Sequence, residues 1–174
     1  MRAKSSDNEL RSPFELPSPA RKGSEFVETP GSESLETPIG VFTVNMSGTS
    51  VETPSGQCLE YVKAFSNAIE LRRGARIETP EGLVDVATVR GRAFRRGRNI
   101  AITGAGIHWT AKRSGFMRAE LVDDQGRLLA LATRGGYRTL VDADLGETAL
   151  GLVILLSSSG VLTMTSRFEL TLSP

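Results

Sequence analysis

The sequence contains a single cysteine, Cys58, and a single histidine, His108, among its 174 residues. One cysteine cannot form a disulfide within the chain, which excludes the small disulfide-stapled secreted folds and favours a reducing compartment. Two potential Cys and His ligands are too few for a closed structural zinc site. Nucleophilic catalysis of the Ser-His-Asp or Cys-His type needs a base beside the nucleophile. We expect His108 to lie on a strand, on the opposite face from Ile107 and Trp109, in a structural role.

The chain also lacks a long hydrophobic run. The longest, Ala149–Leu156, has eight residues, whereas a membrane-spanning helix needs about 20, and no apolar segment marks a secretory signal. A glycine loop that cradles a phosphate leads from a strand into a helix, whereas Gly104 and Gly106 lie between two expected strands. The sequence therefore has neither a dinucleotide-binding nor a P-loop fingerprint. The acidic pairs at 123–124 and at 142 and 144 are explained by a turn and a helix start. We therefore expect a cytoplasmic protein that is not an enzyme and holds no cofactor or metal.

Turn signals recur at intervals along the chain. Each recurring unit begins with an aliphatic residue, has Pro or Asp where a turn begins, and ends in a Gly that is free to adopt positive φ. We expect hairpin turns at all four units, Leu35–Gly40, Val51–Gly56, Ile77–Gly82 and Leu121–Gly126.

Runs of β-forming residues follow and separate these turns, which predicts a mainly β fold. We expect an antiparallel barrel or sandwich of repeated hairpins, because closure of a sheet removes exposed edges. Residues 57–71 fit either a helix or strands, and we favour strands. The remaining strands are expected at 83–89, 97–103, 106–112, 116–122, 127–133, 136–141 and 161–172.

One helix is expected at about 145–157. Asp144 and Glu147 have the spacing of a capping box, and Gly160 supplies a stop signal. Between these signals the helix is apolar on every face, so it should be buried within the protein.

The chain divides into a polar arm, 1–35, and a single β-rich domain, 36–174. The arm holds four of the eight prolines and many Ser and Glu residues, but almost no periodic apolar pattern. The sequence leaves open whether it is disordered or docks on a neighbouring subunit or a protein partner.

The near-neutral net charge of +1 conceals a strongly basic segment, because residues 72–118 carry eleven basic and three acidic residues. Such a segment can focus a positive potential toward an anion, such as a phospholipid head group or a nucleotide, with nucleic acid less favoured. The alternative is a solvated face paired with acidic parts of the same chain. The candidate anion-binding residues are Arg90, Arg92, Arg95, Arg96, Arg98, Lys112 and Arg113.

The segment Trp109–Thr133, with its Asp-rich turn between two strands, followed by the apolar helix at 145–157, resembles the LURP-one-related/tubby-like family. The similarity covers roughly residues 77–157 and, more loosely, the hairpins from residue 35. It implies an antiparallel barrel around a hydrophobic helix and a non-catalytic module that engages phosphorylated lipid head groups through a basic face. In that family the hydrophobic helix is central and terminal, whereas in this sequence a strand is expected after the helix, at 161–172.

A second resemblance is to PilZ domains, which bind a cyclic dinucleotide. Arg72 and Arg76 fit the Arg-x-x-x-Arg element, and Asn99 to Gly104 fit the Asp/Asn-x-Ser-x-x-Gly element, although Ala101 replaces its serine. Guanidinium groups can clamp phosphates and stack on bases. This resemblance implies a nucleotide site at Arg72, Arg76, Asn99 and Gly104.

Three functional classes remain. The first, which we favour, is a binding module at the inner membrane surface. The second is a cyclic-dinucleotide receptor, and the third is an assembly protein whose arm docks on a neighbouring molecule.

Overall fold

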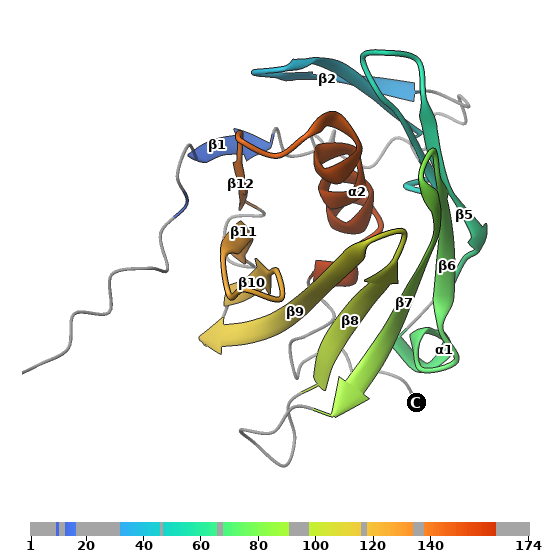
Figure 1. Ribbon diagram of the computed structural model, residues 1–174, viewed down its shortest axis with the longest axis vertical. Helices are drawn as coiled ribbons and strands as arrows, with labels where there is room; N and C mark the ends of the chain where they lie inside the picture. The colour runs from blue at the N-terminus through green and yellow to red at the C-terminus, as the bar shows by residue number, and fades with distance from the viewer. Residues whose placement is uncertain are drawn as a thin grey trace, which may run out of the picture.

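The computed structural model describes residues 10, 13–16, 32–45, 47–65, 68–90, 98–115, 118–133 and 138–162, with only the backbone described at 68, 69, 90, 98 and 138. The fold is mainly β, as expected. Twelve antiparallel strands form one sheet that curls into a nearly closed barrel around a single long helix (Figure 1).

The strand order is β1-β12-β11-β10-β9-β8-β7-β6-β5-β4-β3-β2, so β2 to β12 form an up-and-down meander in which each strand pairs with the next, and β1 pairs with β12. The end strands β1 and β2 approach each other across the remaining seam (Figure 1). The elements are β1 (Pro13–Leu16), β2 (Ser32–Thr37), β3 (Gly40–Asn45), β4 (Ser50–Glu52), β5 (Cys58–Lys63), α1 (Ala68–Leu71), β6 (Ala75–Thr79), β7 (Gly82–Arg90), β8 (Arg98–Gly104), β9 (Ile107–Gly115), β10 (Arg118–Val122), β11 (Leu128–Thr133), β12 (Arg138–Asp142) and α2 (Glu147–Ser158).

The core lies between α2 and the inner face of the sheet. Every residue of α2 from Leu150 to Leu156 is buried, because this helix is apolar all round and the barrel surrounds it. The strands contribute alternate residues such as Ile100 and Ile102, both fully buried. Burial of each large aliphatic side chain contributes about 1.5–3 kcal/mol, so the helix and barrel depend on each other for stability.

All four expected hairpin turns are present, and their glycines Gly40, Gly56, Gly82 and Gly126 have positive φ. Two of the Glu-Thr-Pro turns use their threonine in the same way. The hydroxyl of Thr37 donates to the carbonyl of Gly40 at 2.8 Å, and the hydroxyl of Thr79 donates to that of Gly82 at 2.8 Å. The repeated motif is therefore local turn chemistry.

The expected apolar helix is confirmed, but its capping box is wrong. The N-cap is Gly146, and no side chain caps the helix. The carboxylate of Glu147 instead accepts a hydrogen bond of 2.7 Å from the backbone N–H of Ser55, in the β4–β5 turn. Asp142 does not cap the helix either, because its carboxylate is fully buried and accepts hydrogen bonds from Arg127 at 2.6 Å and from the N–H of Asp144 at 3.0 Å.

Three other segments complete the comparison with the sequence. Residues 57–71 contain both expected alternatives, with β5 followed by the short helix α1. Val161 and Leu162 were expected to begin a strand, but they form a buried 3₁₀ turn after α2, and residues 163–172 lie outside the described part of the chain. Within the polar arm, Pro13–Leu16 pairs with β12 of the same chain as β1.

Candidate anion-binding site

The meander gives the barrel two distinct ends. Successive strands run in opposite directions, so alternate connections lie at opposite ends. One end, called here the turn end, carries the tight turns after β2, β4, β6, β8 and β10. The other, called the loop end, is where β3, β5, β7, β9 and β11 finish and their partners begin.

Basic residues gather at the loop end. Arg90, the last residue of β7, lies directly opposite Arg98, the first residue of β8. Arg113 lies near the end of β9, and Arg118 begins β10 opposite Gly115. We call the full set the basic rim, and it consists of Lys63, Arg72, Arg73, Arg90, Arg98, Lys112, Arg113, Arg118 and Arg138.

The structure therefore brings four of the seven candidate residues to one end of three adjacent strands. Arg90, Arg98, Lys112 and Arg113 lie on β7, β8 and β9. The other three candidates, Arg92, Arg95 and Arg96, belong to the β7–β8 connection and lie outside the described residues.

Several rim cations have no acidic partner among the residues that the structure describes. Ion pairs there join Arg76 to Asp85 and Arg127 to Asp142, neither of which involves the rim. Lys112 faces Glu120 across the β9–β10 ladder without an ion pair. Three rim side chains, Arg72, Arg73 and Arg118, are exposed and form no ion pair with any residue that the structure describes.

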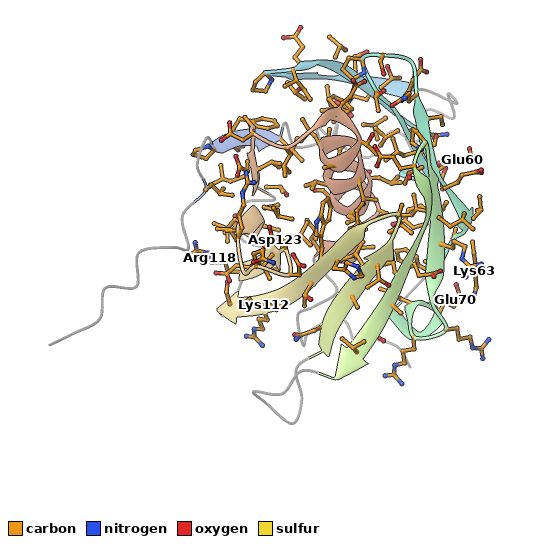
Figure 2. The ribbon with its side chains drawn as sticks, viewed as in Figure 1. Glu60, Lys63, Glu70, Lys112, Arg118 and Asp123 are labelled. Atoms are coloured by element: carbon orange, nitrogen blue, oxygen red, sulfur yellow. The ribbon has the colours of Figure 1, made fainter. Side chains whose placement is uncertain are left out.

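Two rim side chains are held by backbone carbonyls. Nε of Arg113 donates to the carbonyl of Gly115 at 2.6 Å, and Nζ of Lys63 donates to that of Arg73 at 3.0 Å. These bonds orient each side chain. Figure 2 shows Lys63 beside α1 and Lys112 near the end of β9.

The alternative nucleotide-binding residues divide between the two ends of the barrel, with Arg72, Arg76 and Asn99 toward the loop end and Gly104 at the turn end. Arg72 follows α1 at the loop end, whereas Gly104 ends β8 at the turn end. Nε of Arg76 donates to the carboxylate of Asp85 at 2.7 Å on the outer wall, and this hydrogen bond and charge raise the pKa of the guanidinium. Asn99 lies at the other end of β8 from Gly104. The structure thus does not bring these four residues together.

Four rim residues were not among the sequence candidates, namely Lys63, Arg73, Arg118 and Arg138. Lys63 and Arg138 fall outside the basic segment 72–118, whereas Arg73 and Arg118 lie within it. The missing signal is the order of the strands, because the meander places the end of β5, the start of β10 and the start of β12 at the same end of the barrel.

His108 and Cys58 lie on different strands. His108 is exposed and sits opposite Thr103, whereas Cys58 is exposed and sits opposite Glu52. Partial burial, followed by the charges of Glu60 and Glu52, raises the pKa of the Cys58 thiol, which disfavours its nucleophilic thiolate form. Among the described residues, no group of His, Cys, Asp and Glu side chains is arranged to hold a metal ion.

In the described part of the chain, neither helix has the length and hydropathy needed to cross a lipid bilayer. Comparison of the chain with known proteins gives no match to a family model, a curated protein or a solved structure. The expected architecture of a barrel around a hydrophobic helix is observed, but a fold alone does not define a function. The tubby-like and PilZ resemblances therefore stay predictions.

Proposed function

We propose that this chain is a non-catalytic binding module whose basic rim engages anionic lipid head groups at a membrane surface. The observation that carries the proposal is the gathering of cations from many strands at one end of the barrel, several of them without a carboxylate partner among the described residues. Clustered Lys and Arg attract anionic lipids, at about 1 kcal/mol for each residue near the surface.

The extent of the rim favours a surface over a single small ligand. Its cations begin at the end of β5 and continue past the start of β10. At about 4.8 Å between neighbouring strands, these six strands span on the order of 24 Å along the curved sheet. A row of that length can contact several head groups at once, whereas a single nucleotide would use only part of it.

Vesicle flotation tests the proposal. We expect the protein to float with phosphatidylserine vesicles, to stay behind with phosphatidylcholine vesicles, and to be released as salt rises, because surface attraction is screened. Arg118→Gln should weaken partitioning about fivefold, as expected for the loss of one surface cation.

Gln125→Glu is the matched control, since it lowers the net charge by the same one unit at an exposed position of the β10–β11 turn, at the turn end. Its partitioning should stay within about twofold of wild type, because the added carboxylate lies at the opposite end of the barrel from the membrane-facing rim and is screened by salt. Equal loss for both variants, or equal flotation with both kinds of vesicle, would show that the rim is not the contact surface.

The cyclic-dinucleotide alternative has its own test. Calorimetric titration of wild type and Arg72→Ala with a cyclic dinucleotide should give no heat of binding if the rim serves lipid surfaces. Saturable heat that disappears in Arg72→Ala would favour the receptor function instead.

A further inference from the structure

The turn end of the barrel carries the opposite charge from the basic rim. Five acidic residues lie there, each from a different connection or strand end around the barrel. All five are exposed and have no ion pair among the described residues. We call them the acidic ring, which consists of Glu36, Glu52, Glu81, Asp124 and Asp144.

We propose that the acidic ring of one molecule docks on the basic rim of a second copy, so that the barrels associate head to tail. This inference goes beyond membrane binding, because it gives the rim a protein occupant and gives the turn end a role. The occupant is argued from charge complementarity between two faces of the same chain.

The geometry of the barrel makes the two faces fit each other. Both rings are built on the two ends of the same strands, so they share the strand spacing of about 4.8 Å and follow the same curved sheet. Cations and carboxylates of stacked barrels can therefore face each other at a similar distance from the barrel axis. The net charge of the chain is only +1, so long-range repulsion between copies does not oppose the contact.

A contact between two different faces has a defined consequence for assembly. Each docked molecule leaves one free rim and one free ring, so the association is open-ended and does not stop at a dimer. Exposed ion pairs are individually weak and are screened by salt. The assembly should therefore form at high protein concentration and low ionic strength.

Sedimentation velocity with charge-reversal variants tests this arrangement. At about 0.02 M salt, the mass of the wild type should rise with concentration well above the monomer value, and at about 1 M salt, where the Debye length is about 3 Å, it should return to monomer. The ring variant Glu81→Lys/Asp124→Lys and the rim variant Lys112→Glu/Arg118→Glu should each stay monomeric alone, because each lacks one of the two faces.

Mixing gives the decisive result. The ring variant keeps a normal rim and the rim variant keeps a normal ring, and their two reversed faces also carry opposite charges, so an equal mixture should recover association, with species of at least twice the 18.7 kDa monomer mass. A monomeric wild type at low salt, a monomeric mixture, or association of either variant alone to the wild-type extent would overturn the inference.

A charge-matched control and a lipid assay separate this inference from the proposed function. Glu60→Lys/Glu78→Lys makes the same change in net charge on paired wall strands, and it should associate as the wild type does. The ring variant should still float with phosphatidylserine vesicles, because its rim is intact. A wild type that floats with these vesicles but stays monomeric at low salt therefore contradicts only head-to-tail docking, whereas loss of wild-type flotation contradicts only the lipid function.

Discussion

The arginines of this protein have different roles, which depend on the residues beside them. Arg76 is paired with Asp85 on the outer wall, and Arg127 reaches the buried carboxylate of Asp142. Arg118 lies exposed at the loop end without a described carboxylate partner. The first two arginines hold strands together, and only the third is available for an external anion.

Gly104 illustrates how a candidate ligand residue can have a structural role. It has a φ of +125°, and a Cβ atom added there would lie 2.3 Å from the carbonyl oxygen of Leu83. The neighbouring strand is thus close enough that only glycine fits.

We predict that Gly104→Ala lowers the free energy of unfolding by at least about 3 kcal/mol, because it combines a Gly-only backbone conformation with a backbone clash. Gly106→Ala is the control, since Gly106 has a φ of +76° and open space around its Cβ position. It should lose only about 1–2 kcal/mol from the left-handed conformation. Urea denaturation measures both, and equal losses would mean that the close approach to Leu83 is not tight.

At the scale of elements, α2 is anchored to the β4–β5 turn at its start. Hydrogen bonds from the side chain of Thr53, then from the side chain and backbone of Ser55, lower the pKa of Glu147. The carboxylate therefore joins the first turn of the helix to a strand connection that is distant in sequence, while Asp144 stays exposed.

We predict that Glu147 contributes to the stability of the protein above pH 4.5, its ordinary pKa, and that this contribution is lost as the pH falls through its lower folded-state value. Glu147→Gln should reduce stability at neutral pH and remove this part of the acid dependence. Asp144→Asn should leave both unchanged. Thermal melts of both variants between pH 3 and pH 7 test this prediction. A larger loss of stability in Asp144→Asn than in Glu147→Gln would contradict it and would support Asp144 as the cap of α2.

The local elements could be predicted from the sequence where short-range chemistry decides them. The four hairpin turns follow from Pro, Asp and Gly at fixed positions, and α2 follows from an apolar run with a terminal Gly160. The anchoring of Glu147 could not be predicted, because Ser55 lies 92 residues away. The basic segment 72–118 is visible in the sequence as a local excess of charge, but only the order of the strands brings Lys63, outside that segment, to the same end of the barrel as Arg118.

At the scale of the whole molecule, the up-and-down order of the strands places successive connections at opposite ends of the barrel. Acidic residues predominate at the turn end, whereas basic residues outnumber acidic ones such as Glu33 and Glu70 at the loop end. The protein is thus electrically polarised although its net charge is only +1. This polarity underlies both the proposed lipid contact and the proposed contact between copies.

The orientation of the barrel on a bilayer tests the central claim most directly. A fluorophore on Cys58, which is exposed where β5 begins at the turn end, is compared with one on Ser114→Cys in a Cys58→Ser background, exposed near the loop end of β9. With phosphatidylserine vesicles that contain a brominated quencher lipid, we predict strong quenching at position 114 and little at position 58. Equal quenching at both positions, or stronger quenching at 58, would contradict a membrane-facing basic rim.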